Sequence, residues 1–253
     1  MIIIGNGRVG GGLKLRAERL GSRVTCLGRD DSFGSLMQNP GKPILVCTNA
    51  GDLAEVIHAT PTRFRPDLVF IQNGMLDTFL TREGLSDSTR GLLYFAVPKR
   101  GVEPQPGGAS IFSGPHAEVM TEFFRELGLE ARCVSRQDFS NEMASKLIWN
   151  CVFGLLSDVL DCPVGTICIE HRASVDGLVA ELVSICNAGI QTTLEANATS
   201  EDLVAYSMSI PEYQGALKQW EWRNGWFDET AGRLGIDTPL HNKFLVGRRP
   251  TGR

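Results

Sequence analysis

The stretch Met1-Ile2-Ile3-Ile4-Gly5-Asn6-Gly7-Arg8-Val9-Gly10 decides the fold of this 253-residue chain. Its apolar start predicts a buried strand, and the pattern G-x-G-x-x-G follows directly, ahead of a helix expected over residues 13–20. In a dinucleotide-binding loop the first glycine permits a tight turn, the second lets a pyrophosphate approach the backbone, and the third lets helix pack on strand. We therefore predict that a dinucleotide binds at Gly5, Asn6, Gly7, Arg8, Val9 and Gly10. The alternative is a glycine-rich turn without a ligand.

Short apolar runs separated by helical patterns continue outward from this unit. They predict strands at residues 24–27, 43–47, 67–71, 92–97, 109–112 and 131–134, and a helix over about 115–127. Runs that are apolar on both faces are typical of a parallel sheet covered by helices on both sides. After Asp138 the pattern predicts helices alone, over 140–160, 175–198 and twice within 205–234. We expect an α/β chain with an N-terminal Rossmann-type parallel-sheet domain, residues 1–137, and an all-helical domain, residues 138–253.

Composition excludes several classes of protein. The 25 Lys and Arg against 29 Asp and Glu give a net charge of −4, and no basic stripe is present to follow a nucleic-acid backbone. No uninterrupted apolar run reaches the roughly 18 residues of a membrane span. Seven Cys without a C-x-x-C pair and four scattered His predict neither a disulfide framework nor a metal site. With no targeting segment visible, we expect a cytoplasmic protein.

The type of cofactor is read after the second predicted strand, at Leu27-Gly28-Arg29. Enzymes that use NAD place an acidic residue there to bind the ribose 2′-hydroxyl, whereas an arginine accommodates the 2′-phosphate of NADP. Arg29 therefore favours NADP. In the alternative, Arg29 is a solvated turn residue and Asp30 binds the ribose of NAD.

Several segments together resemble the ketopantoate reductase family over residues 1 to about 245. They are Gly5 to Gly10, Gln72-Asn73-Gly74, Lys146-Leu147-Ile148-Trp149-Asn150, Cys162-Pro163-Val164-Gly165, Ser207-Met208, Asn224-Gly225 and Gly235-Ile236-Asp237-Thr238-Pro239. The resemblance implies reduction of 2-dehydropantoate to pantoate with NADPH, on the route to coenzyme A. It also implies that the Rossmann domain binds the dinucleotide and that the helical domain serves the substrate and a possible homodimer.

The resemblance assigns site residues one by one. Lys146 is expected to be the general acid, Asn150 a substrate-binding residue, and Asn73 a residue that reaches both cofactor and substrate. Ser207 is expected to bind the substrate carboxylate, although from the sequence alone a helix-start cap is nearly as good an interpretation. Gln219 occupies the place of a family acidic residue and is assigned to the cofactor side.

Three positions depart from the family pattern. Gly154 and Val164 stand where the family offers asparagines, and the uncharged Gln219 stands where it has an acid. These departures make ketopantoate itself a doubtful substrate. A relative that reduces another 2-oxo acid or an imine, and a catalytically idle NADP-binding protein, stay open as alternatives.

The residues themselves support the role given to Lys146. Lys146 and Asn150 are four apart and so share one helix face, in a stretch that is apolar almost all round. A buried ammonium could donate a proton to a developing alkoxide and stabilise its charge.

Lys99 and Arg100 could meet an anion, but an exposed loop pair is the favoured interpretation. The histidines at 58, 116 and 171 have no acidic partner at a useful sequence spacing.

Overall fold

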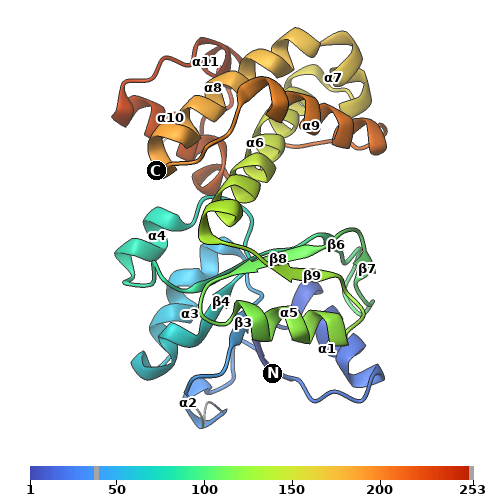
Figure 1. Cartoon of the computed structure of the whole chain (residues 1–253), viewed down its shortest axis with the longest axis vertical. Helices are drawn as coiled ribbons and strands as arrows, with labels where there is room; N and C mark the ends of the chain where they lie inside the picture. The colour runs from blue at the N-terminus through green and yellow to red at the C-terminus, as the bar shows by residue number, and fades with distance from the viewer. Residues whose placement is uncertain (37–39, 251–253) are drawn as a thin grey trace. The chain divides into compact units, whose positions relative to one another are not determined.

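Seven strands form one sheet in the first of two units, Met1–Phe139 (Figure 1), in a computed structural model that describes residues 1–36 and 40–250. The strand order is β2-β1-β3-β4-β5-β8-β9. Their bounds are β1 (Ile2–Ile4), β2 (Thr25–Leu27), β3 (Ile44–Val46), β4 (Leu68–Phe70), β5 (Thr89–Leu92), β8 (Ser110–Ser113) and β9 (Ala131–Cys133). All neighbours are parallel except β5 and β8. The predicted parallel-sheet fold is confirmed.

Helices cover this sheet. They are α1 (Arg8–Arg19), α2 (Phe33–Leu36), α3 (Leu53–Ala59), α4 (Asp77–Arg82) and α5 (Ala117–Glu126), with 3-10 turns η1 (Ala50–Asp52) and η2 (Thr62–Asp67). Leu13 of α1 and Phe124 of α5 join Ile3, Leu45 and Phe112 of the strands in one buried core. This core fixes α1 against the carboxyl end of β1, where the glycine-rich loop begins.

The strand predicted at residues 92–97 is wrong in its bounds. β5 lies earlier, at Thr89–Leu92, and Phe95–Ala96 forms β6, which pairs with β7 (Gln105–Pro106) in a separate two-stranded sheet. The sequence of β5 looks too polar for a central strand. Arg90 is nevertheless only 9% exposed, because its guanidinium donates to the Asp77 carboxylate over 2.9 Å.

The second unit, Ser140–Arg253, is helical in its described residues. Its elements are α6 (Arg136–Leu160, which begins in the first unit), α7 (Val164–Glu170), α8 (Arg172–Ile190), α9 (Ala196–Ser209), η3 (Trp220–Trp222), α10 (Asn224–Leu234) and α11 (Pro239–Leu245). The helix predicted over 175–198 is two helices. α8 ends at Ile190 because the Asn187 side chain bonds the backbone of Leu194 and so holds the turn that follows.

Two helices of this unit, α6 and α8, have the length and apolar composition of membrane spans. The same properties belong to the core helices of a soluble domain. Phe153 of α6 and Leu182 of α8 are fully buried inside the unit. Figure 1 shows the two helices packed among α7, α9, α10 and α11, so their apolar surfaces form the core of this unit.

Candidate functional site

The three motif glycines differ in their backbone conformation and surroundings. Gly5 has a φ of 103°, which L side chains rarely adopt. A Cβ on Gly10 would lie 2.0 Å from the carbonyl oxygen of Gly5, so α1 can approach β1 only without a side chain there. A Cβ on Gly7 would meet no protein atom within 4 Å. The space above Gly7 is therefore left for something other than the protein, as a pyrophosphate loop requires.

The start of α1 is prepared for an anion. Gly7 is the N-cap, no side chain caps it, and the first turn contains no acidic residue. The first N–H groups of a helix have no partner within the helix, and together with the helix dipole they favour negative charge. Arg8, the first residue of the helix, is exposed and adds a cation. The predicted motif residues thus form a phosphate-binding geometry.

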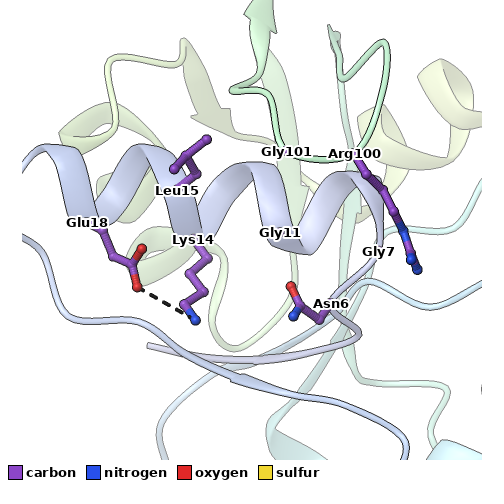
Figure 2. Close-up of a pocket in the computed structure, with 8 residues that line it drawn as sticks. All are labelled: Asn6, Gly7, Gly11, Lys14, Leu15, Glu18, Arg100 and Gly101. Atoms are coloured by element: carbon purple, nitrogen blue, oxygen red, sulfur yellow. Dashed lines mark ion pairs between the residues drawn. The ribbon is translucent and has the colours of Figure 1, made fainter.

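An open hollow of about 260 Å³ lies along one side of α1, from the glycine-rich loop to Glu18 (Figure 2). It is lined by Asn6, Gly7, Gly11, Lys14, Leu15, Glu18, Arg100 and Gly101. Arg100 belongs to the loop after β6 and lies beside Gly7 in Figure 2. Arg100 is an exposed loop residue, as the favoured interpretation expects, but the sequence gives no sign that residue 100 returns to the glycine-rich loop.

The end of β2 distinguishes Arg29 from its acidic neighbours. The Asp31 carboxylate accepts from the backbone N–H of Gly28 over 2.6 Å, which engages it in the turn. Arg29 is exposed and forms no ion pair with any residue that the structure describes. Asp30 is exposed too. The geometry therefore allows Arg29 to bind the 2′-phosphate of NADP and also allows Asp30 to bind the ribose of NAD.

Asn73 follows β4 at the same edge of the sheet as the glycine-rich loop. Its neighbour Gln72 donates to the carbonyl oxygens of Val46 and Thr48, over 2.9 and 3.1 Å, and so ties this loop to the end of β3. Thr48 in turn lies against Gly5: a Cβ on Gly5 would be 3.1 Å from the Thr48 side chain. The loops after β1, β3 and β4 therefore meet, and Gln72 is a positioning residue that the sequence did not single out.

In the second unit, Lys146 and Asn150 lie one turn apart on α6. Burial, and to a smaller extent the Arg223 guanidinium, lowers the pKa of Lys146 to about 8. Asn150 donates its side-chain N–H to the carbonyl oxygen of Lys146 over 2.8 Å. This bond fixes the amide over the turn that carries Lys146. A lysine with a pKa near neutrality is suited to proton transfer.

Ser207 lies in the interior of the unit. It is fully buried, its hydroxyl donates to the carbonyl oxygen of Leu203 over 2.8 Å, and it accepts from the Trp149 indole over 2.9 Å. It is near the end of α9, so the interpretation as a helix-start cap is wrong. The structure gives the hydroxyl a packing role, and its predicted role toward a substrate carboxylate stays a prediction without geometric support.

The segment of residues 211–217, here called the strap, covers the positions of two family departures. A Cβ on Gly154 would lie 2.8 Å from the carbonyl oxygen of Ala216. The Val164 N–H donates to the Tyr213 carbonyl over 2.9 Å, and the Gly215 N–H to the Ser157 hydroxyl over 3.2 Å. The strap thus lies against α6 and α7 where side chains of a substrate site were expected.

Gln219 lies just beyond the strap, before η3. It is exposed and has a φ of 50°, in the left-handed region. Its carbonyl oxygen accepts from the Trp222 N–H over 3.0 Å, which shapes the turn. Nothing in this geometry assigns its side chain to a cofactor, and that assignment stays a prediction.

Two histidines have acidic partners, contrary to expectation. His116 lies 3.0 Å from Asp67, and His58 lies 3.1 Å from Glu83. The sequence could not show these pairs because 49 and 25 residues separate the partners. Asp67 directly precedes β4, at the edge of the sheet opposite the glycine-rich loop. The His116–Asp67 pair therefore lies outside the dinucleotide site.

Comparison with known proteins agrees with this architecture. Residues 138–246 match the family described as ketopantoate reductase PanE/ApbA C terminal. No curated protein sequence matches the chain significantly.

Solved structures of this fold cover nearly the whole chain. A PanE/ApbA family ketopantoate reductase from Ralstonia eutropha has 15% identity and a TM-score of 0.77, with 97% of this chain and 96% of that chain covered. A 2-dehydropantoate 2-reductase from Geobacter metallireducens has 18% identity and a TM-score of 0.77, with coverages of 97% and 98%. A D-mandelate dehydrogenase in complex with NADH has 13% identity and a TM-score of 0.75, with coverages of 97% and 96%. At these identities the likeness shows the fold.

Proposed function

We propose, on the premise that residues 138–246 form a ketopantoate reductase C-terminal domain, that this chain is an NADPH-dependent reductase of a 2-oxo acid. The observation that carries the proposal is Lys146. It lies on the long helix of that domain, with Asn150 one turn on and a pKa lowered to about 8. Burying an ammonium group costs free energy, which favours a functional reason for a lysine at this position.

The cofactor residues fit a phosphorylated dinucleotide. Gly7 leaves open space for a pyrophosphate, Arg8 adds a positive charge at the start of α1, and Arg29 is an uncompensated cation at the end of β2. An arginine can bind a 2′-phosphate through two parallel hydrogen bonds. We assign NADPH on this ground, although one structure of the same fold contains NADH.

The reaction reduces a carbonyl to an alcohol. When bound, NADPH supplies the hydride that adds to C2 of the 2-oxo acid. Negative charge then develops on the carbonyl oxygen, and the Lys146 ammonium donates a proton to that oxygen as the charge forms. The Asn150 carboxamide, held on the adjacent turn by its bond to the Lys146 carbonyl, is placed to orient the substrate.

Ketopantoate is not the substrate that the second unit favours. A side chain at position 154 would collide with the Ala216 carbonyl oxygen. The Val164 N–H already donates to the Tyr213 carbonyl of the strap. Hydrogen-bonding groups for a substrate hydroxyl are therefore missing at both positions. We favour a 2-oxo acid without that hydroxyl. The D-mandelate dehydrogenase fold neighbour, crystallised with anilino(oxo)acetate, makes an aromatic 2-oxo acid a reasonable member of a test panel.

The test is NADPH oxidation by the purified chain against a panel of 2-oxo acids that includes ketopantoate and aryl-substituted oxoacetates. We expect turnover with at least one acid and a higher kcat/KM for a less polar acid than for ketopantoate. A ketopantoate kcat/KM above about 10⁵ M⁻¹s⁻¹, well within the normal enzyme range, would establish the plain family reaction instead. Binding of NADPH without turnover of any acid or imine would indicate a catalytically idle protein.

The oligomeric state of the chain is a separate part of the proposal. One fold neighbour is described as a dimeric ketopantoate reductase from Staphylococcus aureus. We propose a homodimer for this chain as well, to be checked by light scattering.

A further inference from the structure

Arg223 is a cation of the second unit that forms no ion pair with the residues that the structure describes. It lies between η3 and α10, and its backbone is bonded to Trp220 and Phe227. Its Nε atom is buried without any hydrogen-bond partner. Among residues 1–36 and 40–250 no carboxylate forms an ion pair with it. A buried donor without a partner costs about 1–3 kcal/mol, so this arginine is held at a cost in stability.

The position of Arg223 is fixed next to the helix that carries Lys146. The adjacent residue, Asn224, is buried and donates its side-chain N–H to the Cys151 carbonyl of α6 over 3.4 Å. Cys151 follows Asn150 directly in the sequence. The guanidinium is close enough to lower the pKa of Lys146, and burial lowers the pKa of Arg223 itself. Two cations therefore face the same region of α6.

We propose that Arg223 binds the carboxylate of the 2-oxo acid beside Lys146, an inference that rests on the proposed reductase function. In a 2-oxo acid the carboxylate is bonded directly to the carbonyl carbon. Its receptor must therefore lie close to the group that protonates the carbonyl oxygen. One bound anion then supplies a charge-assisted partner for Arg223 and lies next to the Lys146 ammonium. No sequence motif assigned this arginine.

The alternative receptor is unsuited to the task. Ser207, which the family resemblance assigned to the carboxylate, is fully buried and bonded to Leu203 and Trp149. Releasing it would break both bonds. The Arg223 Nε is buried and has no hydrogen-bond partner, so binding a carboxylate there would break no existing hydrogen bond of this atom.

The experiment compares Arg223→Gln and Arg223→Lys with the wild-type chain. The control is Arg233→Gln, an exposed arginine of α10, the helix that follows Arg223. Each protein is assayed with the best 2-oxo acid and with its neutral amide. Loss of a hydrogen bond to a charged group, about 1.5–3 kcal/mol, predicts a rise in KM for the acid of roughly 10- to 100-fold at about 1.4 kcal/mol per tenfold. The KM for the amide should change little. The KM of Arg223→Lys for the acid should lie between those of the wild-type chain and Arg223→Gln.

A pH profile provides a readout that a merely structural role would not change. Tyr213 and Cys151 are the other titratable groups that act on Arg223, and Glu142 lies one turn before Lys146 on α6. The protonated Lys146 is the active form, so kcat/KM should fall as the pH rises through about 8. Removing the Arg223 charge raises the pKa of Lys146, and the fall should move to higher pH in Arg223→Gln.

Failure of this inference differs from failure of the proposed function. If the wild-type chain reduces a 2-oxo acid and Arg223→Gln shows the same KM for the acid and the same pH profile, Arg223 is not the receptor. If the wild-type chain reduces no acid, the reductase proposal fails. Oxamate binding, measured by fluorescence titration, then decides whether Arg223 binds a carboxylate. Oxamate binding that Arg223→Gln abolishes would keep the assignment of Arg223 as a carboxylate receptor. Equal or absent binding in both proteins would overturn it.

Discussion

At the scale of single residues, Lys146 carries the chemistry that we assign to the second unit. Lys146→Ala should lower kcat by about 10²- to 10⁴-fold, the usual contribution of a positioned acid. NADPH affinity should stay near the wild-type value, because the cofactor motif belongs to the other unit. Stopped-flow or steady-state oxidation of NADPH measures the effect, with the exposed Lys243→Ala as control. Turnover near the wild-type rate in Lys146→Ala would remove this lysine from the mechanism.

Arg29 tests the proposed choice of cofactor, because in that proposal it binds the 2′-phosphate of NADPH. Arg29→Ala removes a two-pronged contact to the 2′-phosphate, so NADPH binding should weaken by about 1.5–3 kcal/mol and NADH binding should hardly change. Titration calorimetry with both nucleotides measures the two affinities, and Arg23→Ala, another exposed arginine nearby, is the matched control. Equal wild-type affinity for NADH and NADPH would contradict the assignment and favour Asp30 as the ribose ligand.

The sequence predicts some residues of the site well and others not at all. Gly5 and Gly10 were predictable because a positive φ at Gly5 and the close approach of α1 to β1 at Gly10 exclude a side chain. Arg223 was not, because its lack of a partner depends on how η3 and α10 pack near α6. Ser207 matched a motif, but a motif does not report burial.

At the scale of elements, the contact between α6 and the strap predicts a sharp effect of one methyl group. Gly154→Ala places a Cβ about 2.8 Å from the Ala216 carbonyl oxygen, a backbone atom that cannot turn aside. Overpacking of this kind should destabilise the chain by roughly 1–3 kcal/mol, measured by urea unfolding. In Gly232→Ala on α10 the new Cβ meets nothing within 4 Å, so this control should be neutral or slightly stabilising. Equal stability of the two variants would show that the strap yields freely.

Element prediction succeeded where periodicity is strong and failed where tertiary contacts decide. The helix expected over 140–160 appears in α6, which begins earlier, at Arg136. β5 was misplaced because the Asp77 carboxylate makes burial of Arg90 tolerable, a pairing that no local pattern shows. The strap was read as part of a helical region, yet residues 211–219 form no helix. Its bonds to Ser157, Val164 and Gly165 replace the helical ones.

At the scale of the whole molecule, one histidine should make stability depend on acid. His241 is fully buried, and desolvation lowers its pKa from 6.5 to about 4. Between pH 4 and pH 6.5 the His241 imidazole is mostly protonated in the unfolded chain but mostly neutral in the folded chain. Stability is therefore full above about pH 6.5 and falls as the pH drops toward 4, by up to about 3 kcal/mol.

Urea unfolding from pH 7.5 to 4.5 measures this loss. His241→Gln should lower the stability at neutral pH but flatten its dependence on pH in this window. His171→Gln, which removes a partly exposed histidine of the same unit, should leave the slope unchanged. An unchanged slope in His241→Gln would show that other groups cause the acid sensitivity.

The aromatic packing around α6 also has an optical consequence. All four tryptophans of the chain, at positions 149, 220, 222 and 226, belong to the second unit, and the Trp149 ring contacts Phe153, Tyr206 and Tyr213. Tryptophan fluorescence thus originates in one unit, whereas the reduced nicotinamide that would absorb it is expected on the other. Energy transfer from the tryptophans to the nicotinamide would report binding of the reduced cofactor in real time, without any added label.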